Sequence, residues 1–381
     1  MVVPAPPVRP GCGWVIAALD DEICFPMLTT HNAPASYLLA LLGSLLLGWP
    51  ICAVLQRLRI LDQPNQRSSH VAPTPRGGGI AIILVIVASS LWMSRSHKDQ
   101  LMWVAPLVAV LVGIISLVDD VRGVSAGVRF ATHIGGALVL IWGLGFTISV
   151  GPMAVLAEQL QLPLPLIILL MMLWLVGYTN AFNFMDGING IAGTQAGVSA
   201  FAMAAVAGVS IGRWDSAPVM VSLAVSGAAL GFLPHNFPKA RMFMGDVGSA
   251  PLGLLLSFLV LWICREHSFH LFIPLAMIHA NFILDTSVTL LRRIARGDRW
   301  LDSHREHFYQ RLVRAGFSHT AVTSCEGFLL IMVSIISVLV ARSSTAVQLG
   351  ALATVIFIWG VFFSIAEYIF WRFNQKLLPG I

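Results

Sequence analysis

Residues 107–120 have the sequence LVAVLVGIISLVDD, in which apolar and small residues run directly into a pair of aspartates. Such a run is typical of a helix inside a lipid bilayer, which needs about 20 mostly apolar residues to cross the hydrocarbon region. Hydrophobic residues make up 57% of the whole chain and charged residues only 11%, and the mean hydropathy is +0.82. Soluble domains carry about 25% charged residues. The composition therefore predicts an integral membrane protein.

Eleven apolar stretches are candidates for membrane-spanning helices. An open sheet leaves backbone groups unsatisfied in lipid, so we expect an all-α, polytopic membrane helical bundle with about 10–11 transmembrane helices. The cysteines show no metal-ligand spacing and are given no role. The expected spans lie at 36–55, 77–94, 101–118, 131–150, 163–179, 188–210, 216–233, 250–264, 270–291, 325–341 and 346–370.

The distribution of basic residues orients the bundle, because cytoplasmic loops are enriched in Lys and Arg. With the N-terminus outside, 17 of the 23 basic residues face the cytoplasm. This bias accounts for the net charge of +5 without a nucleic-acid partner. The Pro-rich residues 1–35 form a flexible extension, unless the true start lies near Met27. Residues 36–370 then form the membrane domain and 371–381 a cytoplasmic tail.

Five polar clusters interrupt the apolar chain, and the predicted topology places all of them on the cytoplasmic side. Loops that only connect helices have no reason to keep their carboxylates, histidines and glycines on one face. We therefore predict a single active site at the membrane surface. The clusters are LDQPNQRSSHVAPTPRGGG from Leu61, the Asp119–Asp120 pair, NFMDGING from Asn183, HNFPKARMFMGDVGS from His235, and SHREHFYQRL from Ser303.

Two of these clusters hold acids at helix ends. Adjacent carboxylates at Asp119 and Asp120 raise one another's pKa unless a cation or a proton compensates, although simple solvation of a helix end is the alternative. In NFMDGING, a spacing of three predicts that Asn183, Asp186 and Asn189 share one helical face. The alternative for this segment is an ordinary turn rich in Asn, Asp and Gly.

The other two C-terminal clusters point to cation and phosphate binding. Asp246 lies between two glycines before an apolar helix, where it either holds a divalent cation or caps the helix. His304 and His307 are three residues apart, so both imidazoles would lie on one helical face beside Arg305, a sensible cradle for a pyrophosphate. An amphipathic helix on lipid headgroups is the alternative. No third His or Cys at ligand spacing supports zinc.

Oxygen ligands without thiols favour a hard cation such as Mg²⁺, with Mn²⁺ as a second choice, together with substrate phosphates. A site at the cytoplasmic membrane surface meets a soluble nucleotide on one side and a lipid headgroup on the other. These features predict phosphoryl transfer to a membrane lipid. Two alternatives are a secondary transporter, for which Asp285 is the main acid inside a span, and a non-catalytic scaffold.

The motifs LVDD, NFMDGINGIAG, FMGDVGS, the histidine-containing fifth cluster and DQPNQRSSHVAPTPRGGG resemble those of the polyprenyl-phosphate N-acetylhexosamine-1-phosphate transferases. The similarity runs in order through roughly residues 36–340. It implies Mg²⁺-dependent transfer of a sugar 1-phosphate from a UDP-activated amino sugar to undecaprenyl phosphate, with release of UMP. It further implies a multi-pass protein of the bacterial inner membrane that contacts membrane lipids and forms a homodimer.

The resemblance also implies roles for individual residues. The fifth cluster departs from the many members with consecutive histidines, because Arg305 and Glu306 separate His304 from His307. This departure makes the chain more similar to enzymes that start O-antigen synthesis than to the peptidoglycan enzyme. The implied catalytic residues are Asp119, Asp120, Asp186, His304 and His307, the implied metal ligands are Asp246 and Asp120, and the implied substrate contacts are Asn183, Asn189, Arg305, His70, Arg76 and Asn236.

Overall fold

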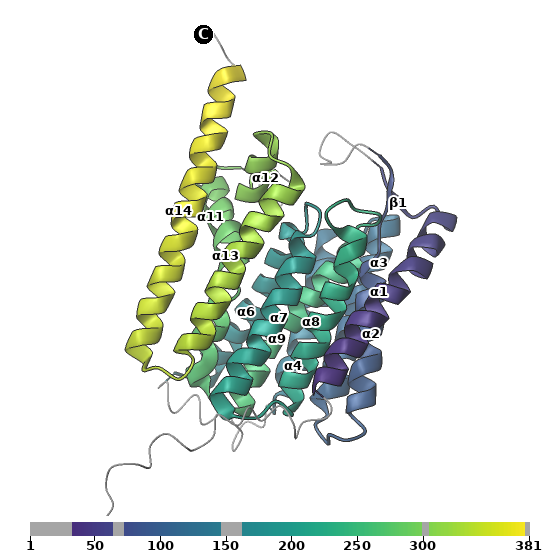
Figure 1. The fold of residues 1–381 in the computed structure, drawn as a ribbon, viewed down its shortest axis with the longest axis vertical. Coiled ribbons are helices and arrows are strands. Elements are labelled where there is room, and N and C mark those ends of the chain that lie inside the picture. The colour runs from purple at the N-terminus through teal and green to yellow at the C-terminus, as the bar shows by residue number, and fades with distance from the viewer. Residues whose placement is uncertain (1–32, 64–71, 146–161, 299–304, 378–381) are drawn as a thin grey trace, which may run out of the picture.

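The computed structural model describes residues 33–63, 72–145, 162–298 and 305–377. Within these ranges the long elements are all α-helices, which stand side by side in one bundle (Figure 1). The strands described are one short antiparallel pair, β1 (Leu61–Asp62) with β2 (Thr74–Pro75). The prediction of an all-α membrane bundle is confirmed. The helices are α1 (Ala33–Arg57), α2 (Gly79–Met93), α3 (Leu101–Arg122), α4 (Ala126–Gly143), α6 (Leu164–Met185), α7 (Ile191–Ile211), α8 (Ala217–Asn236), α9 (Asp246–Glu266), η2 (Phe269–Leu271), α10 (Phe272–Met277), α11 (Ala280–Ala295), α12 (Phe308–Arg314), α13 (His319–Val340) and α14 (Thr345–Leu377).

Nine helices in the described ranges are long and apolar enough to span a membrane, and the bent pair Phe269–Met277 and Ala280–Ala295 makes up to a tenth. The stretch predicted at 77–94 forms only the 15-residue α2, whose length of about 22 Å is less than the roughly 30 Å of bilayer hydrocarbon. The last helix continues to Leu377, beyond the predicted end at 370.

The prediction of one continuous span over 270–291 is wrong, because the chain bends by 71° between α10 and α11. A broken helix frees backbone carbonyls, which must find partners inside the protein. Gln195 on α7 supplies one, since its Nε2 donates to the carbonyl oxygen of Ile278 at 3.3 Å. His279 adds a second contact through its Nδ1, 2.7 Å from the Tyr178 hydroxyl. The polar residues at the break thus make the bend stable.

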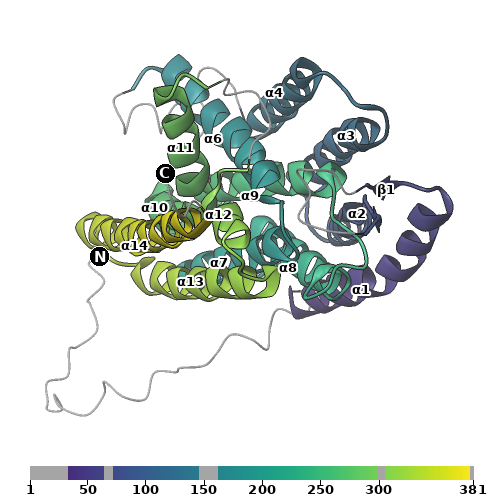
Figure 2. The same ribbon diagram turned by 90° about the horizontal axis from the view of Figure 1, so that it is seen from above.

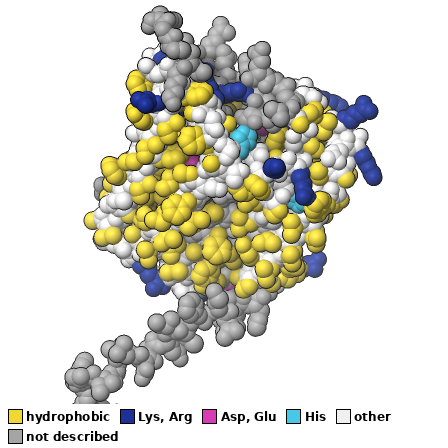
Figure 3. All heavy atoms as spheres, turned by 45° about the horizontal axis from the view of Figure 1, so that its top comes forward, with side chains coloured by type: hydrophobic (Ala, Val, Ile, Leu, Met, Phe, Trp, Pro, Cys, Tyr) yellow, Lys and Arg dark blue, Asp and Glu magenta, His cyan; other side chains and the backbone are white. Residues whose placement is uncertain are grey.

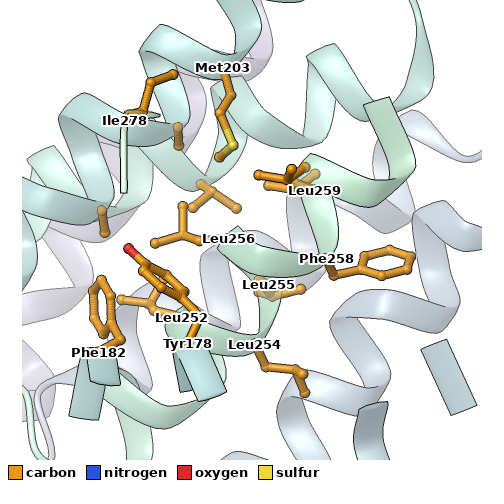
Figure 4. Packing of buried hydrophobic residues seen from close by; sticks show 14 of the residues in the cluster. Tyr178, Phe182, Met203, Leu252, Leu254, Leu255, Leu256, Phe258, Leu259 and Ile278 are labelled. Atoms are coloured by element: carbon orange, nitrogen blue, oxygen red, sulfur yellow. The ribbon is translucent and has the colours of Figure 1, made fainter. Parts of the chain in front are cut away.

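Helix α9 forms the centre of the bundle (Figure 2). Its most apolar 18-residue stretch is buried throughout, as expected of a helix that is hydrophobic on all sides. Leu252 and Leu256 lie beside Tyr178 and Phe182 of α6 (Figure 4). Gly253 permits this approach, because a Cβ there would lie 2.8 Å from the Cβ of Phe182. The position of α9 matters for the site, because its first residue is Asp246.

One end of the bundle collects the polar segments. Helices α3, α6, α8 and α11 finish there, α2, α7, α9 and α13 begin there, and α12 and β1 lie above them (Figure 1). Lys and Arg side chains gather around this end, while a broad hydrophobic band covers the side of the bundle in view (Figure 3). The described parts of all five polar clusters therefore meet at one end of a membrane-embedded bundle.

Candidate active site

The backbone of the first polar cluster lies against that of the fourth. The amide nitrogens of Gly77 and Gly78 donate to the carbonyl oxygen of Phe243 at 3.2 and 2.8 Å. The next helices are in contact as well, because a Cβ on Gly79 would lie 2.2 Å from the Cα of Gly248. Only glycine permits two backbones to approach this closely. The glycines of RGGG and FMGDVGS thus bring Arg76 beside Asp246.

Arg76 joins two carboxylates from distant parts of the chain. Its Nη2 lies 2.8 Å from Oδ1 of Asp120 and 2.8 Å from Oδ1 of Asp246. The Asp120 side chain is only 1% exposed, whereas that of Asp246 is 21% exposed. Gly245, at φ +73°, leaves the room required, since a Cβ there would lie 2.9 Å from Oδ2 of Asp120. These three charged side chains form the centre of the candidate site.

The structure separates the two aspartates of the pair. Asp120 faces Arg76, while Asp119 accepts the amide of Val124 at 2.6 Å and pairs with Arg129 at 2.9 Å. Arg129 also lies 4.0 Å from Oδ2 of Asp246. Asp119 therefore holds the start of the loop to α4 and positions a second guanidinium near the centre. Sequence reasoning gave Arg129 no role in the site, although a basic residue one turn into the next helix was a visible signal.

The predicted shared helical face of Asn183, Asp186 and Asn189 is wrong. Helix α6 ends at Met185, and the following residues form a turn in which Gly190, at φ +80°, adopts a left-handed conformation. Asn183 remains on the helix and donates to the Ser249 hydroxyl at 2.9 Å. Asn189 turns away, and its Nδ2 donates to the carbonyl oxygen of Pro238 at 3.2 Å.

Asp186 follows α6 directly and lies half-buried near the other acids. Burial raises its pKa from the usual 3.8 to about 7, and the negative charge of Asp246 adds to the increase, although Arg76 counteracts it. Asp120 contributes in the same direction as Asp246. Three carboxylates thus share one positively charged neighbour, an arrangement that a cation would stabilise.

Asn236 has both ends of its amide engaged within the protein. Its Oδ1 accepts the amide of Gly190 at 2.7 Å, and its Nδ2 donates to the carbonyl oxygen of Met242 at 3.0 Å. The side chain is buried, so it ties the start of α7 to the 235–249 segment. Nothing in this geometry shows the substrate contact predicted for Asn236.

The fifth cluster differs from its predicted form. His307 precedes α12 and does not lie on its face, and its buried imidazole Nδ1 lies 2.8 Å from Oδ1 of Asp285. Arg311 pairs with Glu367 of α14 at 2.7 Å and so faces away from the acids. Arg305 is half-buried, and its carbonyl oxygen accepts Arg314 Nη1 at 3.2 Å. His304 and His70 lie outside the described residues.

The acids at the centre fit a hard divalent cation. Among the described residues Oδ1 of Asp120 is buried, and the 2.8 Å approach of the Arg76 guanidinium lacks the geometry of a hydrogen bond. No group of three or more His, Cys, Asp or Glu side chains in the described ranges is placed to hold a metal ion alone. Mg²⁺ commonly binds one or two carboxylates and completes its coordination with substrate phosphates and water. Asp120 and Asp246 match that pattern.

Comparison with known proteins identifies one family and several relatives to which this chain is similar. A family model described as glycosyl transferase family 4 matches residues 102–264. A probable undecaprenyl-phosphate N-acetylglucosaminyl 1-phosphate transferase of Bacillus subtilis is 30% identical over 349 residues, which cover 89% of this chain and 94% of that protein. A decaprenyl-phosphate N-acetylglucosaminephosphotransferase of Mycobacterium tuberculosis is 32% identical over 306 residues, or 72% of this chain and 74% of that protein. A phospho-N-acetylmuramoyl-pentapeptide-transferase of Symbiobacterium thermophilum is 31% identical over 236 residues, or 57% and 69%.

The fold and the site define a polytopic membrane protein with a carboxylate- and arginine-rich centre at one end of its helical bundle. The similarity to the Bacillus protein extends through nearly all of that relative. This chain belongs to the polyprenyl-phosphate N-acetylhexosamine-1-phosphate transferase family.

Proposed function

We propose that this protein transfers an N-acetylhexosamine-type sugar 1-phosphate from a UDP-sugar to undecaprenyl phosphate and releases UMP. The observation that carries the proposal is the Arg76 bridge between Asp120 and Asp246 at the polar end of a membrane bundle. The names of the relatives support a polyprenyl-phosphate acceptor and an amino-sugar donor. The product would start a lipid-linked cell-surface glycan, and the separated histidines of the fifth cluster favour O-antigen.

The chemistry requires an anionic acceptor to approach an anionic donor. An oxygen of the lipid phosphate attacks the sugar-linked phosphorus, the bond from that phosphorus to the bridging oxygen breaks, and its electron pair leaves with UMP. Mg²⁺, held by Asp246 and Asp120, would supply charge neutralisation. Arg76 and Arg129 lie where they would orient phosphate oxygens. Asp120, buried beside them, would orient the acceptor or take its remaining proton.

A transporter is the less supported function, because transport requires an acidic side chain inside a membrane span that is free to bind an ion or a substrate. Both carboxylate oxygens of Asp285 accept hydrogen bonds, one from Phe308 N at 2.9 Å and the other from Thr289 at 3.1 Å.

The decisive assay combines purified protein, Mg²⁺, undecaprenyl phosphate and a series of UDP-amino sugars. We expect equal amounts of UMP and lipid-linked sugar phosphate. Failure with every donor, in folded protein, would reject the proposal.

The direct route predicts a specific exchange behaviour. The acceptor phosphate is already an anionic nucleophile, and attack by an aspartate would bring a carboxylate against an anionic pyrophosphate. Radiolabelled UMP should therefore enter the UDP-sugar only when the lipid product is present. The control is the same enzyme after exhaustive removal of lipid. Exchange in that lipid-free enzyme would show a covalent phospho-sugar intermediate and reject direct transfer.

The proposed location is the bacterial inner membrane, with the site facing the cytoplasm. Ser125 is exposed at the polar end, whereas Lys98 is exposed in the loop at the other end of α3. Each is replaced by cysteine in a chain without its native cysteines. A membrane-impermeant maleimide should label the Lys98→Cys variant in spheroplasts and the Ser125→Cys variant only after the membrane is opened. The reverse labelling pattern would contradict the orientation.

A further inference from the structure

Asp285 is a buried acid that the reaction described above does not use. It lies on α11, its side chain is 2% exposed, and it is within hydrogen-bonding distance of three groups. Oδ1 is 2.8 Å from Nδ1 of His307 and accepts the Thr289 hydroxyl at 3.1 Å, while Oδ2 accepts the amide of Phe308 at 2.9 Å. Both carboxylate oxygens are thus engaged by groups of α11 and of the segment that starts α12. Asp285 therefore fixes the first residues of α12 to α11.

Two residues after His307, Tyr309 contacts the segment that carries Asp186. The Tyr309 hydroxyl donates to the carbonyl oxygen of Phe184 at 3.1 Å, and its ring covers Gly187. A Cβ on Gly187 would lie 2.1 Å from that hydroxyl oxygen. Burial raises the pKa of Tyr309 well above its usual value, and the charges of Asp285 and Asp186 add to this, so the hydroxyl remains a donor. The aromatic ring thus sets the space available to the turn.

These contacts form one continuous connection between α11 and the candidate site. We propose that Asp285 and Tyr309 are positioning residues, which hold the 184–187 turn so that Asp186 faces Asp120 and Asp246. Neither residue contacts the central acids, and neither was predicted to take part in catalysis or substrate binding. The inference deepens the proposed function and rests on it. Its structural part, a fixed 184–187 turn, is measurable without catalysis.

Asp285→Asn tests the first contact. A neutral amide has one oxygen acceptor where the carboxylate has two, so either His307 or Phe308 loses its partner. We expect kcat to fall about 10- to 100-fold, because a misplaced catalytic group of this kind costs that much, while KM for both substrates changes less than threefold. The matched control is Thr289→Val, which removes only the third donor and should retain wild-type kcat.

A suppressor pair tests the second contact. Gly187→Ala should lower kcat because its methyl group meets the Tyr309 hydroxyl. Adding Tyr309→Phe should restore the part of the loss that this clash causes, while the hydrogen bond to Phe184 stays lost. The nearest remaining ring atoms would lie 3.1 and 3.2 Å from the methyl carbon, which small shifts accommodate. A role in stability alone predicts no such recovery of kcat in the double variant.

Hydrogen exchange of the 183–190 segment supplies the readout that is independent of activity. Exchange there should accelerate at least tenfold in Asp285→Asn and remain at the wild-type rate in Thr289→Val. An inactive wild-type protein would reject the proposed function, while the exchange rates would still decide whether Asp285 fixes the turn. Unchanged exchange and unchanged kcat in Asp285→Asn, or no recovery in the double variant, would overturn the inference.

Discussion

Asp246→Asn is expected to lower kcat by about 10²- to 10³-fold, a loss typical of removing one electrostatic contact to a transition state. Asp246 begins α9, is partly exposed and contacts Arg76. Loss of its charge should therefore affect the site more than the packing of the bundle. Because the proposed cation would lose one of two carboxylates, the Mg²⁺ concentration for half-maximal activity should rise as well. Initial rates over a Mg²⁺ series measure both effects.

The matched control for this substitution is Asp215→Asn. Asp215 also pairs with an arginine, Arg213, but lies in the loop between α7 and α8 at the opposite end of the bundle. Its replacement removes the same charge from the same protein and should leave both kcat and the Mg²⁺ requirement unchanged. Wild-type activity of Asp246→Asn at limiting Mg²⁺ would reject the cation assignment.

Arg76→Met is expected to reduce both activity and stability. Asp120 is almost completely buried, and removal of its guanidinium partner leaves two facing carboxylates without compensation. Breaking a buried ion pair costs about 3–5 kcal/mol, and the partial exposure of Arg76 reduces the expected loss to about 2–4 kcal/mol of unfolding free energy. Thermal unfolding in detergent without divalent cations measures this loss.

Mg²⁺ should partly reverse the destabilisation, because a cation binding the folded state stabilises it. The increase in Tm on adding Mg²⁺ is therefore expected to be larger in Arg76→Met than in the wild type. Arg76→Lys is the control, because one nitrogen of Arg76 makes both short contacts and an ammonium group could occupy the same position. An Mg²⁺ response no larger in Arg76→Met than in the wild type would contradict a shared cation position at Asp120 and Asp246.

The sequence predicted the fold class and the position of most helices. Long apolar runs have few alternatives to helix in a bilayer, so α3, α7 and α8 lie close to their predicted ranges. Prediction from the local sequence pattern failed where contacts with distant residues determined the backbone conformation. The break at His279 depends on Gln195 and Tyr178 from other helices, and no spacing within 270–291 indicates those partners.

The candidate site shows the same division between local and distant information. Asp120, Asp186 and Asp246 were identified from their sequence motifs, and the structure brings them together around Arg76. The helical faces predicted for Asn189 and His307 were wrong, because spacing assumes a helix that neither segment forms. Asp285 was considered as the acid of a transporter, and Tyr309 was given no role because in the sequence it resembles an ordinary core aromatic.

By itself the sequence determined that this protein is a membrane helical bundle and that the acids and glycines of its five polar clusters collect at one end. Those properties follow from the hydrophobicity and charge of each segment, which do not depend on its contacts with other segments. Only the tertiary structure decided that Asp120 joins Asp246 through Arg76 while Asp119 holds Arg129. Such pairings depend on how closely separate helices pack, and here the contact of Gly79 with Gly248 sets that distance.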